Sequence, residues 1–311
     1  MPVMQTAISA ALDSAIKELI PAAAEMVDPG KGRLVFRDIT DGRNSIKLSS
    51  IHAEGSFQAY GAGEQLPNQT VFEGATVTVN YEKFGGMRGF DFATEQEVAA
   101  AANGDLRTLA ENWTMGAERT RDKVCSKLIK NNATIYDSKA LFATDHPQLS
   151  KTGAGAAYSN LNATVIAVSV DALRAIIKQM AQTSAVGENG EPIENEPDKF
   201  AVGDWEDYQE LLAIIRSEKK PGGFSNDINT LVGIGDPLYW RGLAPATGTT
   251  RYLYAINTKR GVNGLLYWDQ APFTTEAWYD PSARQTFASG GMHGAAACIN
   301  WRSIFRQAVV A

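Results

Sequence analysis

Residues 105–130 read DLRTLAENWTMGAERTRDKVCSKLIK, and this stretch decides the fold class. Its apolar residues follow one another at steps of three and four, which places them on a single helical face. That face comprises Leu106, Leu109, Trp113, Ala117, Thr120, Val124 and Leu128. The opposite, charged face comprises Arg107, Glu111, Glu118, Arg121, Asp122 and Lys127. The pattern predicts a helix about 40 Å long that is used for packing along its whole length.

Two extended segments precede this helix. Residues 45–51 (SIKLSSI) and 70–84 (TVFEGATVTVNYEKF) alternate polar with apolar or β-branched residues, which is typical of strands. The Gly-rich stretch 54–69 between them is far longer than the loop of a tight hairpin. Because a long two-stranded excursion is only marginally stable alone, it is either a flexible surface hairpin or an arm that docks on a neighbouring molecule.

A shorter helical pattern stands near the start of the sequence. Residues 6–20 place Ile8, Leu12 and Ile16 at helical spacing, and Pro21 is expected to end the helix. We therefore expect a short amphipathic helix in front of the main body. Such a helix and the long hairpin have apolar sides that need partners, and closed symmetric assembly is the usual way to cover them.

After the long helix the pattern becomes mixed. We expect a loop over 142–160, an acidic loop over 186–198, and two helices capped by Ser169 and Asp204. The expected apolar faces of these helices are Leu173, Ile176, Ile177 and Met180 in the first, and Trp205, Tyr208, Leu212 and Ile215 in the second. The expected strands between about 229 and 305 are NTLVGI, RYLYAI, GLLYWD, FTTEAWY, QTFAS and GAAACINW. Since helices and strands do not alternate strictly, the sequence predicts an α+β fold.

The composition is that of an ordinary globular protein. Hydrophobic residues make up 44% of the chain and charged residues 21%, which excludes a disordered chain, and no apolar run is long enough to span a membrane. The net charge of −6 argues against a dedicated DNA-binding protein, which carries a basic surplus. Cys125 and Cys298 have neither a metal-site nor a disulfide spacing, so we expect both to be small buried hydrophobes.

One pair of residues invites a catalytic interpretation. Asp145 and His146 are adjacent in a segment of loop character, and such a pair could supply a general base or a metal ligand. A metal-dependent hydrolase that uses Asp145 and His146 is therefore a distant alternative. No nucleophile elbow, second histidine at ligand spacing or complete phosphate-binding glycine motif accompanies the pair. We predict that His146 is a turn residue, and that the protein is not an enzyme and has no catalytic residues, metal or cofactor.

The order of these parts resembles the major capsid protein of tailed phages with the HK97 fold. Three stretches are similar to Mu-like major head subunits: YDSKALFATDHP at 136–147, YGAGEQLPNQTVFEGATVTVNYEKFG at 60–85 and GMHGAAACINWRSIFR at 291–306. The resemblance runs through most of the chain in order, and it implies an HK97-type α+β fold.

The resemblance also implies a division of the chain. Residues 1–42 would form the N-terminal arm, and 43–84 an extended β-hairpin loop that lies over an adjacent subunit. Residues 85–165 and 280–301 would form the peripheral domain, which contains the long spine helix at about 105–130. An axial domain would be made of residues 166–279 and 302–311.

The function implied is that of a structural shell protein. Its copies would self-assemble into hexamers and pentamers of an icosahedral head that encloses double-stranded phage DNA, contacted weakly and non-specifically. A separate scaffold protein, a portal and a decoration protein are the expected partners, with no membrane. The protein would be made in the bacterial host cytoplasm and located in the virion. The alternative on the same fold is the shell of an encapsulin-like nanocompartment.

Two sets of residues are expected to carry assembly and packing. The expected intersubunit contacts are Phe57, Tyr60, Glu64 and Leu66 in the hairpin, with Ile8, Leu12 and Ile16 in the N-terminal helix. The expected packing residues of the spine helix are Leu106, Leu109, Trp113, Val124 and Leu128.

Overall fold

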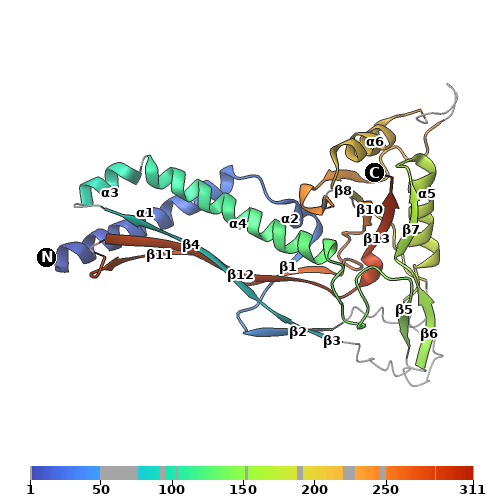
Figure 1. The fold of residues 1–311 in the computed structure, drawn as a ribbon, viewed down its shortest axis with the longest axis horizontal. Coiled ribbons are helices and arrows are strands. Elements are labelled where there is room, and N and C mark those ends of the chain that lie inside the picture. Colours follow the sequence, from blue (N-terminus) through green and yellow to red (C-terminus); the bar gives the residue numbers. More distant parts are fainter. Residues whose placement is uncertain are drawn as a thin grey trace, which may run out of the picture.

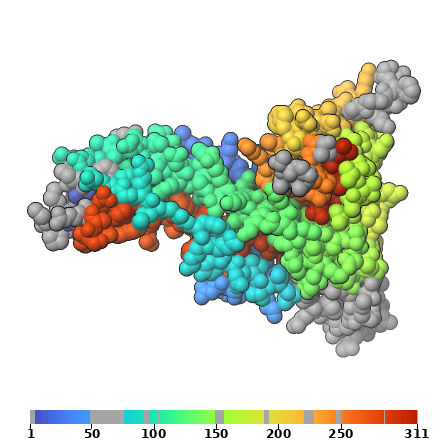
Figure 2. Space-filling view, viewed as in Figure 1, coloured from blue at the N-terminus to red at the C-terminus, as the bar shows by residue number. Residues whose placement is uncertain are grey.

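The computed structural model shows an elongated subunit with a narrow and a broad end (Figures 1 and 2). It describes residues 2–49, 76–91, 95–102, 104–150, 153–187, 192–219, 228–245, 250–283 and 285–310. The N-terminus lies at the narrow end and the C-terminus at the broad end (Figure 1). Over these described residues, no helix is both long and apolar enough to cross a membrane.

A four-stranded sheet runs along the narrow end. Its order is β1-β11-β12-β4, and its strands are β1 (Arg37–Thr40), β11 (Leu265–Asp280), β12 (Gln285–Cys298) and β4 (Glu82–Phe90). The four short strands expected over 264–301 are in fact the two long strands β11 and β12. The expectation failed because the register shifts between Asp269 and Thr274 interrupt the alternation within one continuous strand.

Three helices lie along this sheet: α1 (Pro2–Met26), α3 (Glu95–Ala102) and α4 (Asp105–Lys130). The predicted spine helix is confirmed as α4. Pro21, however, lies inside α1 and does not end it. Its side chain is on the exposed side of the helix, so packing of the other side outweighs a proline penalty of about 3 kcal/mol.

The buried face of α4 is wider than the predicted face. Leu106 and Leu109 are buried as expected, whereas Trp113, Val124 and Leu128 are half-buried. The helix also buries residues outside that face: Ala110, Thr114, Arg121, Cys125, Ser126 and Ile129. Of these, Arg121 was expected on the charged face, and Cys125 is buried as expected. The prediction was incomplete because α4 contacts several elements, among them α1, α2, β12 and the turn at Arg241–Leu243, so more than one side of it is covered.

A five-stranded sheet forms the broad end. Its order is β7-β13-β10-β8-β9, and its strands are β7 (Leu161–Ile166), β13 (Ile304–Val309), β10 (Arg251–Ile256), β8 (Lys199–Val202) and β9 (Asp236–Tyr239). Helices α5 (Val170–Lys178) and α6 (Trp205–Arg216) pack on one face around Phe200, Leu253 and Phe305. A π-helical turn, Gln179–Thr183, continues α5. RYLYAI is confirmed as β10, but residues 229–234 form turns rather than a strand.

The caps of these two helices were predicted correctly, but one face was not. The Ser169 hydroxyl accepts a hydrogen bond from the Ala172 amide, and the Asp204 carboxylate accepts one from Glu206. Leu173, Ile176 and Met180 are buried, as expected for α5. In α6 the expectation for Trp205 was wrong: it is 56% exposed, because Leu211, Ile214 and Ile215 fill the space above the sheet instead.

The described residues also form two antiparallel strand pairs and further short helical turns. The first hairpin pairs β2 (Ser45–Ser49) with β3 (Thr76–Asn80), and the second pairs β5 (His146–Ser150) with β6 (Gly153–Tyr158). The second hairpin stands where a loop was expected. Helix α2 is Lys31–Val35, and a 3₁₀ turn at Trp301–Ser303 precedes β13.

The sheets divide the chain differently from the expected axial domain. Residues 265–279 were placed there, but β11 pairs with β12 along its length and therefore belongs to the four-stranded sheet. The acidic loop expected over 186–198 is packed in part, since the Asn195 side chain is buried and donates to the Arg302 carbonyl at 2.8 Å.

Candidate assembly surfaces

The N-terminal helix is packed within its own subunit. Ile8, Leu12 and Ile16 are at most 3% exposed and share a core with Leu106 and Leu109 of α4. Their expected role as intersubunit contacts is therefore wrong. The apolar face that the sequence showed without a partner is covered by α4, α3 and β11 of the same chain.

The extended hairpin is anchored at its base. Ile46 and Leu48 of β2 are buried against Trp268 and Ala295 on one face of the four-stranded sheet. Tyr81, which follows β3, stacks on His293 with ring centroids 5.3 Å apart. The predicted contact residues Phe57, Tyr60, Glu64 and Leu66 lie outside the described residues. The paired strands β2 and β3 therefore define the place on the subunit where the hairpin starts.

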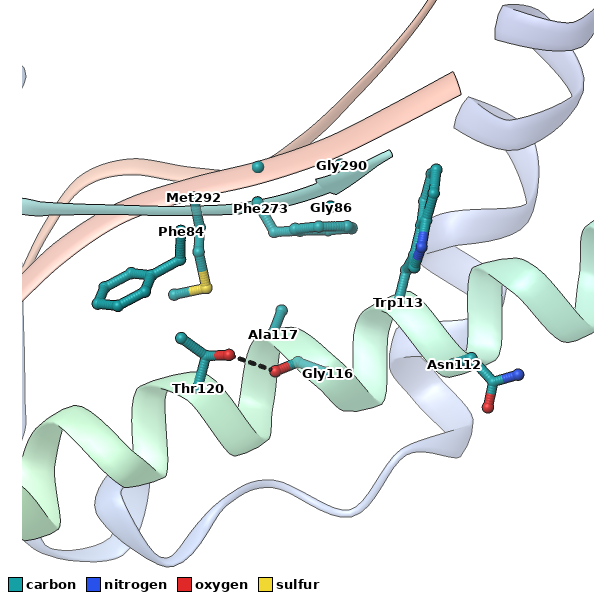
Figure 3. Close-up of a pocket in the computed structure, with 12 residues that line it drawn as sticks. Phe84, Gly86, Asn112, Trp113, Gly116, Ala117, Thr120, Phe273, Gly290 and Met292 are labelled. Carbon is teal, nitrogen blue, oxygen red and sulfur yellow. Dashed lines mark hydrogen bonds between the residues drawn. The ribbon is translucent and has the colours of Figure 1, made fainter. Parts of the chain in front are cut away.

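A hollow lies between α4 and the opposite face of the same sheet (Figure 3). Its volume is about 190 Å³. Aromatic and thioether side chains of β4, α4, β11 and β12 form its walls: Phe84, Trp113, Phe273 and Met292. Five glycines also line it: Gly85, Gly86, Gly116, Gly290 and Gly291. The sequence predicted Trp113 as a packing residue, but the hollow depends on tertiary contacts that no spacing rule reports.

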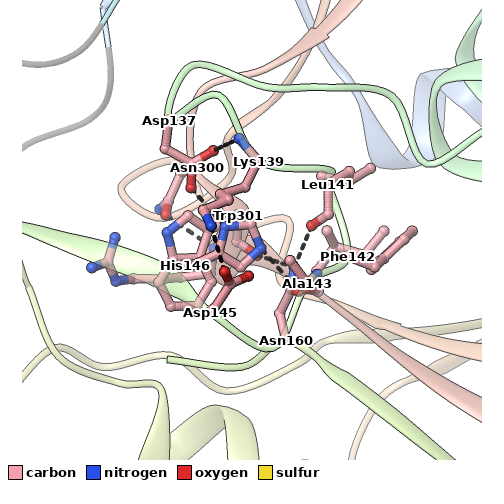
Figure 4. A network of polar contacts seen from close by, with 12 residues as sticks. Asp137, Lys139, Leu141, Phe142, Ala143, Asp145, His146, Asn160, Asn300 and Trp301 are labelled. Atoms are coloured by element: carbon pink, nitrogen blue, oxygen red, sulfur yellow. Dashed lines mark hydrogen bonds and ion pairs between the residues drawn. The ribbon is translucent and has the colours of Figure 1, made fainter. Parts of the chain in front are cut away.

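The prediction of His146 as a turn residue was wrong: it is the first residue of β5 and is buried in a polar network (Figure 4). Its Nδ1 lies 2.6 Å from the Asp137 carboxylate, and its Nε2 lies 3.2 Å from Oδ1 of Asn160. The ring stacks on Trp301, with centroids 4.6 Å apart and planes at 6°. The Asn160 amide nitrogen donates to the Leu141 carbonyl at 2.7 Å and also faces the Trp301 carbonyl. This network ties the segment after α4 to the start of the last strand.

Asp145 does not act together with His146. Its carboxylate pairs with Lys139 at the surface, and this ion pair and the accompanying hydrogen bonds lower the pKa of Asp145. Among the described residues, no group of three or more His, Cys, Asp or Glu side chains could hold a metal ion. The arrangement is suited to holding two segments together and offers no free base beside an acid.

Buried charge between α4 and the sheet was missed by the sequence pattern. Arg121 is 3% exposed; its guanidinium pairs with Asp38 and lies 4.3 Å from the Tyr267 ring centroid. Burial raises the pKa of the neighbouring Asp269. One feature of the sequence could have indicated that Arg121 is buried: it stands four residues before Cys125, which is buried, and so lies on the same side of the helix.

A second buried acid lies under the start of α6. Asp207 is buried beside Arg251, with the carboxylate 3.5 Å from the guanidinium Nε. Desolvation raises the pKa of Asp207 to about 6, and the nearby Asp204 and Glu210 add to the shift. Arg251 also contacts Asp204 at 3.0 Å, so Asp207 shares its cation.

Comparisons with known proteins identify the class to which this arrangement belongs. The family model described as "Phage capsid protein" matches residues 60–307. The procapsid of bacteriophage JBD30 shares the fold with a TM-score of 0.53 at 12% identity, covering 98% of this chain and 76% of that one. A virus-like particle from Pyrococcus furiosus gives 0.51 at 8% identity, covering 94% of this chain and 98% of that one. The search of curated proteins gives no match.

The fold is thus of the HK97 type that builds capsid shells. The chain belongs to the phage capsid protein family. It is a structural major capsid protein of the virion, whose copies associate into the capsid shell.

Proposed function

We propose that copies of this protein assemble into hexamers and pentamers of an icosahedral head that encloses double-stranded phage DNA. The observation that carries this proposal is the base of the long hairpin, strands β2 and β3, which is anchored on the elongated subunit by Ile46 and Leu48. A subunit that spans an elongated body and extends a hairpin from it can overlap its neighbours. Overlap spreads the pressure of packaged DNA over many contacts.

We assign the domains of the subunit according to its two large sheets. Residues 43–84 form the extended loop that lies over an adjacent subunit. The four-stranded sheet with α1, α3 and α4 forms the peripheral domain, which takes in β11 and the packed N-terminal helix. The five-stranded sheet with α5 and α6 forms the axial domain, which gathers around the capsomer axes.

The proposed partners are a separate scaffold protein, a portal and a decoration protein. The protein is made in the bacterial host cytoplasm and has no enzymatic activity, which agrees with the engagement of His146 by Asp137 and Asn160. Its net charge of −6 supports only weak, non-specific contact with packaged DNA, so that DNA can slide during packaging. Among phage heads we propose a Mu-like subunit, on the three sequence stretches quoted above.

An encapsulin-like nanocompartment shell is the second candidate. It is favoured by the fold shared with the Pyrococcus furiosus virus-like particle, which matches over nearly all of both chains. The match to the phage capsid family model favours the phage head instead. A cargo enzyme bound to the inner wall would support the compartment, and neighbouring portal and terminase genes would support the phage.

Deletion of residues 56–66 tests the proposal. The shortened chain keeps β2, β3 and their buried base, so it should fold with an unchanged circular dichroism spectrum. It should fail to form stable shells in negative-stain electron microscopy. Normal shells from the shortened chain would remove the intersubunit role of the hairpin.

A further inference from the structure

Two of the glycines that line the hollow beside the spine helix, Gly86 and Gly116, leave part of it open. Gly85 pairs with Gly291 and Gly86 with Gly290 across β4 and β12. Gly116 lines the hollow from α4 (Figure 3). None of these five glycines has a positive φ, so their backbone conformation is open to any residue. A Cβ built on Gly86 or Gly116 meets no atom within 4 Å. Gly86 and Gly116 therefore leave space, whereas a Cβ on Gly290 would meet the Phe273 ring at 2.7 Å, so Gly290 allows that ring to pack closely.

The size and lining of the hollow fit one apolar ring. An apolar cavity of about 150 Å³ accepts benzene, and this hollow measures about 190 Å³. Phe84, Phe273 and Met292 offer apolar and aromatic walls. The hydroxyl of Thr120 donates to the Gly116 carbonyl at 2.8 Å, so it is already satisfied. A phenyl or phenol side chain matches this lining.

The chain itself carries such rings between β2 and β3, in the long segment that was expected to dock on a neighbouring molecule. Residues 50–75 join the end of β2 to the start of β3. Half of that length, about 13 residues, can extend about 40 Å. Its sequence places Phe57 and Tyr60 among glycines. The base of β2 packs on the sheet face that carries Trp268, whereas the hollow lies on the face covered by α4. The base of the hairpin thus packs on the sheet face opposite the hollow.

We propose that the hollow receives a ring of segment 56–60 from a neighbouring copy of this chain. The inference rests on the proposed function, since it assumes that the extended loop lies over an adjacent subunit, and it names the place where the loop is held. The contact is heterologous: a projecting ring of one copy enters a cavity of the next, which suits a closed ring of subunits.

Filling the hollow tests the proposal. Gly116→Leu places a side chain in the hollow and replaces a helix-interior glycine, so the subunit should fold and melt at the same or a higher temperature. Its yield of shells should fall roughly tenfold or more. Lys123→Leu adds the same side chain to an exposed site on the same helix and should assemble normally. Gly86→Val is the second filling variant if Gly116→Leu does not fold. Normal assembly of a folded filling variant would overturn the proposal.

Cross-linking between copies separates this inference from the proposed function. Asn112→Cys marks the rim of the hollow and Phe57→Cys marks the segment, while the native Cys125 and Cys298 are buried. Shells made from a mixture of the two variants should yield a disulfide-linked dimer on oxidation, and Tyr60→Cys serves as a second reporter. Shells that form but give no such dimer with either reporter would overturn the inference alone. Failure of the unmodified chain to form shells, both alone and with its scaffold protein, would overturn the proposed function.

Discussion

At the scale of single residues, burial decides what the polar side chains do. The His146 ring has the oxygens of Asp137 and Asn160 at its two nitrogens and the Trp301 indole against its face. These contacts hold the ring in one position, so its role is structural. Asp145, its neighbour in sequence, is exposed and pairs with Lys139. Adjacency in sequence suggested a dyad, but successive residues of an extended chain point to opposite sides, and strand β5 begins at His146, directly after Asp145.

Replacing His146 should therefore reduce stability. His146→Ala removes a buried ring and leaves the Asp137 carboxylate and Asn160 short of a partner, which should cost about 2–5 kcal/mol in the free energy of unfolding. Asp145→Ala is the matched control and should change it by about 0.5 kcal/mol or less. Urea denaturation of the two variants measures both values. A His146→Ala subunit as stable as the control would show that the network does not hold the fold.

Asp207 should give the fold a pH dependence. Its pKa is about 6 in the folded chain, raised from an ordinary value of 3.8. Between pH 3.8 and about pH 6, Asp207 loses its proton in the unfolded chain but keeps it in the folded chain. The free energy of unfolding therefore falls as the pH rises through this range. Asp207→Asn removes this loss, and Arg251 keeps Asp204 as a partner. The unfolding free energy of the variant minus that of the natural chain should therefore be about 1–3 kcal/mol larger at pH 7 than at pH 4.

Denaturation curves at both pH values measure this difference. An equal difference between the variant and the natural chain at pH 4 and pH 7 would show that Asp207 has an ordinary pKa. The sequence could not indicate this group, because an acid in the first turn of a helix is usually exposed.

At the scale of elements, the helical pattern of 105–130 predicted that a helix exists there and how long it is. It predicted less well which other elements the helix packs against. The bounds of α4 and the caps Ser169 and Asp204 followed from spacing and local hydrogen bonding, which depend on neighbours in sequence. The burial of Arg121 and the continuity of β11 depend on contacts between distant segments. No pattern within one segment contains that information.

The N-terminal helix shows the difference most clearly. Leu12 is fully buried between α1 and its own subunit's core. Leu12→Ala should therefore lower the unfolding free energy of the unassembled subunit by about 2–5 kcal/mol. Leu19→Ala, at a half-buried position of the same face, should cost less. An unassembled subunit unaffected by Leu12→Ala would restore this helix to the role of an arm that packs on other copies.

At the scale of the whole molecule, the described residues form two large sheets, and α4 packs along one of them and reaches the turn at Arg241–Leu243 that precedes β10 of the other. The four-stranded sheet supports the elongated end, and the five-stranded sheet supports the broad end (Figure 1). The base of the hairpin packs on one face of the first sheet, and the hollow opens on the other. The order of arm, hairpin and spine was visible in the sequence, but the hollow was not, because its glycines come from segments 85–86, 116 and 290–291.

Negative-stain electron microscopy of the purified full chain, with light scattering on the same sample, shows directly whether its copies form a shell. We predict closed shells, tubes or capsomer rings, formed by the chain alone or with its scaffold protein. The diameter of closed shells would distinguish a phage head from a smaller compartment. A monodisperse monomer at high concentration, both with and without the scaffold, would contradict the account.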